Sequence, residues 1–237
     1  MNSILKNQDQ TFVGDTNSKK EKHLKLIENK KNGESFFFYK VNNPDQLAKI
    51  GRSYLEDYKK GIKSFAFSSM SYKAAQQRTV LGLASYFDHL FDLKILIVSD
   101  SLQKGMFEEL LISSKMEKDI FHHGKKMTIK SFHHHFDFLC FSSLLDLKKQ
   151  TIVNHGHLAV MKALVDSYDV ILWDTPIIDS SKRTEIIYSH IMGHLESVTL
   201  VVSPVITSST DINEVRKYFS SYGVDVKGVI FDSTHKE

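Results

Sequence analysis

The sequence predicts an α/β protein with a doubly wound, mostly parallel β-sheet and helices on both faces. Short apolar runs typical of buried strands alternate along the chain with amphipathic stretches of about 10–15 residues, the length of crossover helices. With 237 residues, of which 41% are hydrophobic, the chain is long enough to bury one large core. Ligands of such sheets bind at the carboxyl ends of the strands, so the residues after each strand are the first candidates for a site.

Hydrophobic spacing sets the expected elements, which give a central sheet of about seven strands. A helix is expected after Asn43-Pro44, because Leu47, Ile50 and Tyr54 recur at helical intervals. The apolar run at 36–39 is expected to be a strand or a packed entry segment. The other expected strands are 64–67, 94–98, 136–141, 170–173, 198–202 and 228–231, and the expected helices are 44–60, 74–87, 107–112, 157–166, 186–195 and 211–222.

The first 34 residues differ in composition from the rest of the chain. They are rich in Lys, Asn, Gln and Glu and poor in apolar residues, which predicts a flexible polar and basic arm over 1–34 and a single α/β domain over 35–237. A solvated tail is the favoured interpretation of the arm, and contact with acidic lipids is the alternative. The lysines concerned are Lys19, Lys20, Lys22, Lys25, Lys30 and Lys31.

Charge and cysteine content restrict the class of protein. The 31 basic and 28 acidic residues give a formal charge of +3, which is too balanced to indicate nucleic-acid binding. Cys140 is the only cysteine, so an internal disulfide is excluded and a reducing compartment is indicated. No apolar run reaches the roughly 18 residues of a membrane span, and residues 1–10 do not look like a secretion signal. The expected location is therefore cytoplasmic.

The most informative stretch is the expected strand 170–173 with the sequence Asp174-Thr175-Pro176 after it. In P-loop ATPases an acid at this strand tip holds the shell of the magnesium ion or the attacking water. Asp174 stands at that position, and many other buried strands also end in Asp.

Later segments extend the pattern. The strand 198–202 is followed by Ser203 and then by Thr207-Ser208 before a helix, and the run 223–232 supplies the last strand. With Asp174, this order of motifs resembles the MinD-like branch of P-loop ATPases. Within that branch it resembles the cytoplasmic kinase domain of bacterial tyrosine kinases (BY-kinases), which accompany capsule and exopolysaccharide export. The resemblance covers roughly residues 65–232 in motif order and spacing, and it implies a P-loop NTPase-like fold.

The phosphate loop departs from the family pattern. The resemblance implies a strand end Phe-Thr-Ser followed by Gly-Glu-Gly-Lys-Ser/Thr; the strand end is kept and closes with Ser69. The two glycines become Lys73 and Ala75, whose Cβ atoms obstruct a backbone cradle for phosphate. The phosphate-binding Lys becomes Gln76, and the magnesium-binding hydroxyl residue becomes Gln77. The loop length is kept while its chemistry is lost.

The second family motif, Asp-x-Asp-Leu-Arg after a strand, is lost too. Ser99 and Ser101 replace its two acids, and Asp100 is one residue out of register, so its side chain is expected to point elsewhere. Asp232 aligns with the family's Asn near the base, and the family's tyrosine-rich tail is missing. We therefore expect a vestigial nucleotide site, with no catalytic residues, no ATP and no magnesium. Its residues are Ser69, Lys73, Gln76, Gln77, Ser99, Ser101, Asp174 and Asp232.

Other residue clusters do not form a recognisable site. The histidines gather at 122–123, 133–135 and 155–157, but neighbouring strand residues point to opposite faces and no carboxylate or Cys pattern accompanies them, so no metal site is expected. Cys140 lies in the apolar run 138–141 and is expected to be a small buried hydrophobic residue. Trp173 is expected in the core.

The leading functional hypothesis is a non-catalytic, pseudokinase-like scaffold or regulator of surface polysaccharide synthesis and export. The resemblance implies docking on the cytoplasmic face of a membrane-embedded co-polymerase or export complex, a peripheral location at the inner face of the membrane, and homo-oligomers. One alternative is an active ATP-binding tyrosine kinase or ATPase with an unorthodox site using Lys73, Arg78 and Asp174, in which the two cations attract an anion. The others are a MinD-like positioning adaptor and a small-molecule binder at the strand tips.

Overall fold

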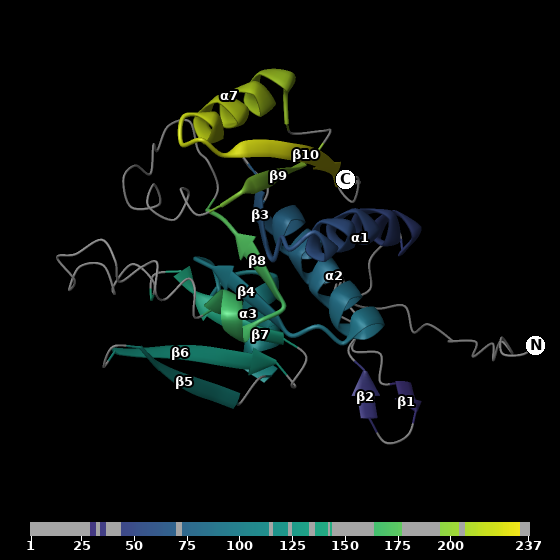
Figure 1. Ribbon diagram of the computed structural model, residues 1–237, viewed down its shortest axis with the longest axis vertical. Coiled ribbons are helices and arrows are strands. Elements are labelled where there is room, and N and C mark those ends of the chain that lie inside the picture. The colour runs from purple at the N-terminus through teal and green to yellow at the C-terminus, as the bar shows by residue number, and fades with distance from the viewer. Residues whose placement is uncertain are drawn as a thin grey trace, which may run out of the picture.

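The computed structural model describes eleven stretches of the chain, and all structural statements concern these residues. They are 29–31, 34–36, 44–69, 73–113, 116–122, 125–132, 136–141, 143, 164–176, 195–203 and 207–232. The elements, arranged as in Figure 1, are β1 (Asn29–Lys31), β2 (Glu34–Phe36), α1 (Pro44–Lys59), β3 (Ser64–Ser68), α2 (Lys73–Phe91), β4 (Ile95–Ser99), α3 (Met106–Ser113), β5 (Met116–His122), β6 (Lys125–Phe132), β7 (Phe136–Cys140), β8 (Val170–Asp174), β9 (Ser197–Val202), α7 (Ser209–Ser220) and β10 (Asp225–Phe231).

The main sheet has eight strands in the order β10-β9-β3-β8-β4-β7-β6-β5. Every pairing from β10 to β7 is parallel, and β6 pairs antiparallel with both β7 and β5. Strand β8 enters late in the sequence and lies between β3 and β4, so the chain winds outward in both directions from the centre. The predicted doubly wound, mostly parallel sheet is confirmed.

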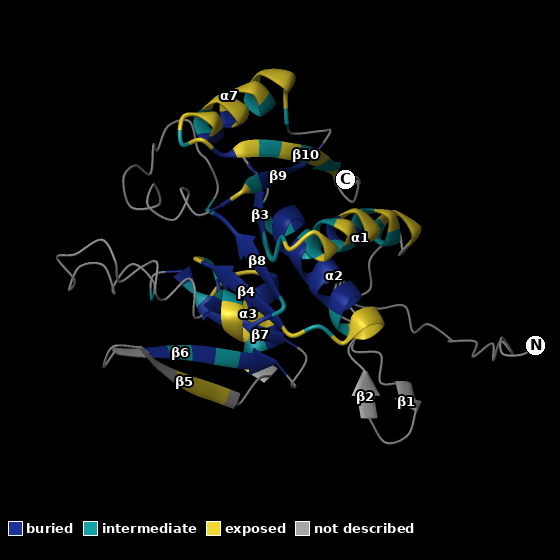
Figure 2. Ribbon diagram, viewed as in Figure 1, coloured by how far each residue is buried: buried dark blue, intermediate teal, exposed yellow. Residues whose placement is uncertain are grey.

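Helices cover both faces of this sheet, as predicted. Side chains alternate along β4: Ile95 and Ile97 join the core on the side of α1, α2 and α3, whereas Leu96 and Val98 join the core on the side of α7. All residues of β4 and β8 are buried, which explains why these strands are nearly continuous apolar runs (Figure 2). Trp173 is fully buried, as expected, and its indole Nε1 donates to Ser64 Oγ at 2.7 Å.

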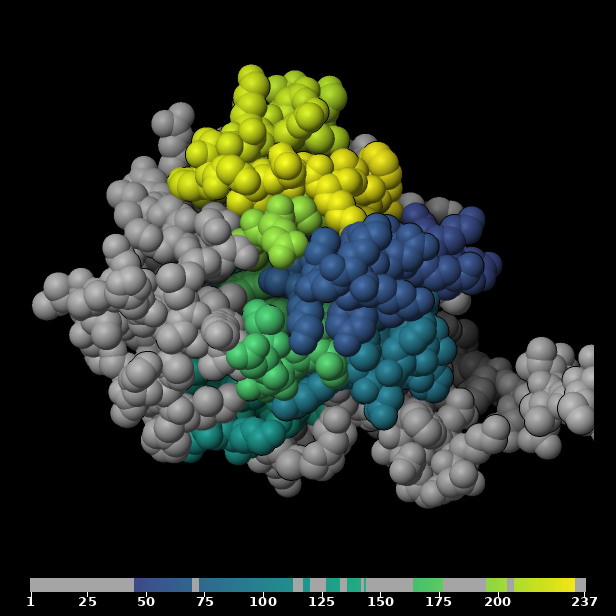
Figure 3. Space-filling view, in the orientation of Figure 1, coloured from purple at the N-terminus to yellow at the C-terminus, as the bar shows by residue number. Residues whose placement is uncertain are grey.

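Helix α1 is fastened to the β9–β10 side of the sheet. The Tyr54 hydroxyl shares a hydrogen bond with the Thr199 hydroxyl. The Lys227 ammonium pairs with Asp57 and stands 4.0 Å from the centroid of the Tyr54 ring. In Figure 3 this helix (dark blue) lies against β10, and β10 and α7 (yellow) form one end of the molecule. The contacts fix the first helix on the face that also carries α2.

The hairpin formed by β5 and β6 was not predicted from the sequence. No strand was expected between 112 and 136, yet β5 and β6 pair antiparallel over their whole length. Residues Met127 and Ile129 of β6 are buried, while β5 exposes Glu117, Lys118 and Asp119 to solvent. A charged edge strand protects the sheet from further pairing, and its polarity also hides the strand from a hydrophobicity pattern.

Several expectations lie outside the described residues or meet them only in part. Strand β2 ends at Phe36, so residues 37–39 of the expected entry segment are not described; within the expected arm, residues 29–31 pair with 34–36 as a hairpin. Residues 164–167 are helical and continue the expected helix 157–166. Residues 186–194 of the expected helix 186–195 and most of the arm lie outside the described residues, and Leu195 is described and is not helical. No helix in the described part of the chain is long and apolar enough to cross a membrane.

Candidate functional site

The candidate site lies where the carboxyl ends of β3, β4 and β8 meet the beginning of α2. Strand β8 is flanked on its two sides by β3 and β4, so Asp174 is paired in register with Phe67 on one side and with Ser99 on the other. Helix α2 begins at Lys73, four residues after Ser69. The fold therefore brings together the strand tips and the helix start that the sequence motifs single out.

Gln76 is completely buried, and its side-chain amide is occupied by contacts within the chain. Its Nε2 donates to the backbone carbonyl of Phe67 at 2.9 Å, to Asp174 Oδ1 at 2.7 Å and to the carbonyl of Thr175 at 2.7 Å. Its Oε1 accepts a hydrogen bond from Ser69 Oγ at 2.9 Å. Both ends of the amide thus tie the helix start to the tips of β3 and β8.

Lys73 directs its ammonium at the same strand tip. Its Nζ lies 3.1 Å from Asp174 Oδ2 and 3.4 Å from Asp100 Oδ1, and it donates to the carbonyl of Thr175 at 2.5 Å. The expectation that Asp100 points elsewhere was wrong, because the chain turns after β4 and brings this carboxylate to Lys73. Sequence reasoning also missed Thr175, whose contribution is a backbone carbonyl and leaves no residue-type signal.

Asp174 is the centre of the cluster and is fully buried. Its Oδ2 accepts a hydrogen bond from Ser99 Oγ at 2.5 Å in addition to the contact with Lys73. Burial raises the pKa of the Asp174 carboxyl above its ordinary value, and the Lys73 ammonium and the Ser99 hydroxyl act in the opposite direction by favouring the charged form. This carboxylate therefore depends on its partners to stay ionised.

Ser101 connects Asp100 to the same cluster. Its backbone N–H donates to Ser99 Oγ at 3.0 Å, and its hydroxyl donates to Asp100 Oδ1 at 2.8 Å. Of the eight residues predicted from the sequence, six are thereby linked by contacts into one strand-tip cluster: Ser69, Lys73, Gln76, Ser99, Ser101 and Asp174. Asp100 and Thr175 complete it.

Gln77 lies beside this cluster and holds the loop between β4 and α3. Its Oε1 accepts from the backbone N–H of Met106 at 3.1 Å, and its Nε2 donates to the carbonyl of Lys104 at 3.3 Å. Gly105 has φ +67°, a backbone conformation that favours glycine, and a Cβ on it would come within 2.6 Å of Gln77 Oε1, so the Gln77 side chain would have to shift. Gln77 thus acts as an anchor for the loop.

Asp232, the last of the predicted residues, pairs with Arg78. The guanidinium contacts Asp232 Oδ2 through Nη2 at 2.5 Å and through Nε at 3.2 Å, and only 17% of the Arg78 side chain is exposed. The backbone N–H of Asp232 donates to the carbonyl of Val202 at 2.8 Å. This pair joins the first turns of α2 to the end of β10.

A small cavity lies between β3, β9 and α7. Its volume is about 10 Å³, the space of a single water molecule. The hydroxyls of Ser68 and Ser203 nearby are buried and have no hydrogen-bond partner among the described residues. The cavity is lined by Ser68, Ser69, Leu200, Val201, Val202, Thr207, Ile212 and Val215. It suits one ordered water.

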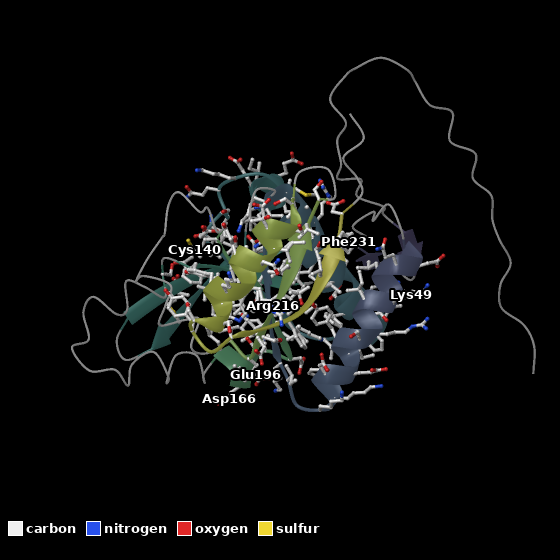
Figure 4. All side chains as sticks on the ribbon, turned by 90° about the horizontal axis from the view of Figure 1, so that it is seen from above. Lys49, Cys140, Asp166, Glu196, Arg216 and Phe231 are labelled. Carbon is white, nitrogen blue, oxygen red and sulfur yellow. The ribbon has the colours of Figure 1, made fainter. Side chains whose placement is uncertain are left out.

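The remaining candidate residues do not extend the site. Within the described residues, no group of three His, Cys, Asp or Glu side chains could hold a metal ion. The histidines at 123, 133–135, 155 and 157 lie outside the described residues. Cys140 is half-buried rather than fully buried and packs against the core. In Figure 4 it lies on the side of the molecule away from Lys49 of α1.

Comparisons with known proteins identify relatives by structure alone. No protein-family model and no curated protein sequence matches the chain. The kinase domain of the Escherichia coli tyrosine kinase ETK superposes with a TM-score of 0.58 at 14% identity, over 83% of this chain and 80% of that domain. The chimerical protein CapA2B2 gives 0.56 at 12% identity, over 82% and 87%. The tyrosine kinase domain of BceF gives 0.52 at 16% identity, over 80% and 79%. The resemblance to BY-kinase domains is thus confirmed for the fold.

Proposed function

We propose that this chain is a non-catalytic, BY-kinase-like scaffold or regulator of bacterial surface polysaccharide synthesis and export. The observation that carries the proposal is the strand-tip cluster, in which Lys73 and Gln76 stand at phosphate-loop positions and are engaged by Asp174 and by backbone carbonyls. The fold relatives include the ETK and BceF kinase domains, which supports descent from a nucleotide-binding scaffold.

The described side chains of this cluster do not offer free donors to a phosphate. Phosphoryl transfer depends almost entirely on backbone N–H groups, a lysine and metal ions arranged around the phosphates. Gln76 carries no charge, and both ends of its amide already have partners. To contact a phosphate, Gln76 would first have to break buried hydrogen bonds to Phe67 and Asp174, and each such loss costs about 1–3 kcal/mol.

A magnesium–nucleotide does not fit the residues present. The hydroxyl ligand is replaced by Gln77, which is engaged with Met106 and Lys104, and the oxygen atoms of Asp174 and Asp100 face the ammonium of Lys73. The second cation near the helix start, Arg78, is paired with Asp232. Among the described residues, the side chains at the positions that would serve the metal or the phosphates thus contact other groups of the same chain.

The proposed partner is a membrane-embedded polysaccharide co-polymerase or export complex, with the chain docked at the inner face of the membrane as a homo-oligomer. This part rests on the resemblance to BY-kinases. Affinity capture of a tagged chain from its own cells, followed by mass spectrometry, tests it. Recovery of an envelope or polysaccharide protein supports the proposal, and a partner set confined to cell division or chemotaxis proteins favours a positioning adaptor instead.

The absence of catalysis is tested by isothermal titration with ATP and ADP, with and without MgCl₂. We expect no binding at millimolar nucleotide. Lys73→Ala and Lys60→Ala each remove one positive charge, and only the first lies at the strand tips, so together they show whether any residual heat comes from this site. Micromolar, magnesium-dependent binding would overturn the proposal, and ATP turnover that is lost in Asp174→Ala would establish an active enzyme.

A further inference from the structure

The Lys73 ammonium contacts four oxygen atoms of the described residues. Asp174 Oδ2 lies at 3.1 Å, Asp100 Oδ1 at 3.4 Å, the carbonyl of Thr175 at 2.5 Å and the carbonyl of Asp174 at 3.5 Å. Only 17% of the Lys73 side chain is exposed, and that of Asp174 is fully enclosed. Two carboxylates and two carbonyls thus surround one positive charge.

This charge is the counter-ion on which Asp174 depends. The other contacts of its carboxylate come from neutral groups, the Ser99 hydroxyl and the Gln76 amide. No other lysine, arginine or histidine of the described residues forms an ion pair with Asp174. A buried carboxylate without a cation is strongly destabilising, so the ammonium is what makes ionised Asp174 tolerable at this position.

The place of Lys73 in its helix supports the same conclusion. Lys73 is the first residue of α2, and the first turn holds no acidic residue. The amino end of a helix carries partial positive charge, so a lysine there is unfavourable unless nearby acids compensate. Asp174 and Asp100 supply that compensation from two strand ends. The lysine is therefore held by its oxygen partners rather than by any preference of the helix.

The same oxygen atoms form a set that hard divalent cations accept. Magnesium and manganese bind through one or two carboxylates, with carbonyls, hydroxyls and water completing the shell. The cluster provides two carboxylates and the Thr175 carbonyl, and the Ser99 and Ser101 hydroxyls each donate to one of the carboxylates.

We propose that Lys73 is the resident cation of the strand-tip cluster, that its ammonium takes the place of a divalent metal ion, and that removing it converts the cluster into a Mg²⁺ or Mn²⁺ site. This inference deepens the proposed non-catalytic function, on which it rests for the view that no metal–nucleotide is needed. The cluster is complete without any ligand, because the chain provides its own positive charge.

The test compares Lys73→Met, which keeps the aliphatic stem and removes the charge, with Lys73→Met/Asp174→Asn, which also removes the central carboxylate. Lys60→Met is the control, since Lys60 is exposed and pairs only at 3.7 Å with Asp57. Each protein is titrated with MnCl₂ and MgCl₂ by calorimetry, bound Mn²⁺ is counted by electron paramagnetic resonance, and thermal unfolding is followed with and without metal.

We expect Lys73→Met to bind one Mn²⁺, and the wild type and Lys60→Met to bind both metals at least about 100-fold more weakly than this variant. Its Tm should rise by about 5–10 °C at a metal concentration of about 100 times Kd. The double variant should fold without metal and bind none. If Lys73→Met does not fold alone, recovery of its native circular dichroism in MnCl₂ supports the proposal equally.

Three results would overturn it. The first is a folded Lys73→Met that is indifferent to both metals, and the second is Mn²⁺ binding by the wild type as tight as by the variant. The third is failure of both variants to fold even in MnCl₂, which would mean that the lysine is needed for something other than its charge. Nucleotide binding by the wild type is measured separately, so failure of the proposed function is distinguishable from failure of this inference.

Discussion

Two buried aspartates lie at opposite ends of the parallel strands of the same sheet, and their partners differ in charge. Asp174 ends β8 at the carboxyl edge and faces the Lys73 ammonium. Asp137, the second residue of β7, lies toward the amino edge, where its carboxylate accepts hydrogen bonds from Ser131 Oγ at 2.5 Å and from the Tyr168 hydroxyl at 2.6 Å. Asp174 is held by a positive charge, and Asp137 by two hydroxyls.

The two carboxylates differ in burial and in the charge of their partners. Asp137 is 8% exposed, accepts from two neutral donors and links β6, β7 and Tyr168, which lies two residues before β8. Asp174 is fully buried and has in addition a cation from a helix start, where a lysine is electrostatically unfavourable. Charged clusters with shifted pKa values are typical of functional sites. In this cluster the charged groups pair with one another.

The strongest test of this comparison is Asp174→Ala. The substitution leaves Lys73, Ser99 and Gln76 without their common acceptor and should lower the free energy of unfolding by about 3–5 kcal/mol. Urea denaturation measures it. Asp100→Ala is the matched control, because Asp100 is partly exposed and should cost no more than about 1 kcal/mol. Equal losses in the two variants would contradict the central role of Asp174.

On the opposite edge, Tyr168→Phe removes one of the two donors to Asp137. A hydrogen bond to a charged acceptor contributes about 1.5–3 kcal/mol, so the loss in urea denaturation should be smaller than for Asp174→Ala. Burial, followed by the nearby Asp137, raises the pKa of the Tyr168 phenol above its ordinary value of 10.0. Burial also raises the pKa of the Tyr54 phenol, so spectroscopic titration should show at least two tyrosines fewer ionising near that pH than in an unfolded chain. Tyr168→Phe should leave the number that ionises near that pH unchanged, and a loss of one would contradict the contact.

The pH dependence of Lys73→Met sharpens the comparison further. The pKa of Asp174 is raised in the folded chain above the 3.8 of an unfolded one, so its protonated form contributes stability below that pH and the contribution is lost as pH rises through the folded pKa. Removing Lys73 raises this pKa further, at about 1.4 kcal/mol per pKa unit. The stability gap between the wild type and Lys73→Met should widen from pH 4 to pH 8, a range of about 4 units. A constant gap would mean that the two charges are not coupled.

The Arg78–Asp232 pair lies next to the strand-tip cluster and joins the start of α2 to the residue after β10. A double-mutant cycle with Arg78→Met and Asp232→Asn should give a coupling free energy of about 1 kcal/mol, since the pair is partly buried. The coupling should persist at high salt because both groups are shielded from solvent. A coupling near zero would remove this pair from the contacts that close the helix start.

The smallest effect is expected on the β5–β6 hairpin. Lys130 and Glu117 form a pair at 3.7 Å with 41% and 60% of their side chains exposed. Lys130→Ala should change the free energy of unfolding by less than about 0.5 kcal/mol, because solvent and side-chain entropy cancel most of the attraction. A larger loss would show that the hairpin contributes more to the fold than its exposed edge suggests.

The sequence predicted the apolar strands and their tips well, and the polar connections between them poorly. Runs such as 94–98 and 170–173 are recognisable because strands buried on both faces need apolar side chains at every position. Their position at the centre of a parallel sheet follows, and with it the meeting of Ser99, Asp174 and the start of α2. The fold class could be inferred from these features alone.

Three features could not be predicted from the pattern of hydrophobic and polar residues in the sequence, each for a physical reason. The Thr175 carbonyl binds Lys73 through the backbone, which every residue possesses. Asp100 reaches the cluster because the chain turns after β4, and strand alternation does not continue through a turn. Strand β5 has exposed charged residues and therefore no hydrophobic period.

Gln77 couples the start of α2 to the loop after β4. Replacing Gln77 by serine or threonine would leave the N–H of Met106 and the carbonyl of Lys104 without their present partner. Gly105, which lies beside the Gln77 side chain in the same loop, has a φ of +67° that favours glycine. The conformation of the loop and the residue at position 77 therefore depend on each other. A single substitution of Gln77 by a short side chain is therefore expected to lower the stability of the loop after β4, well away from the residue that is changed.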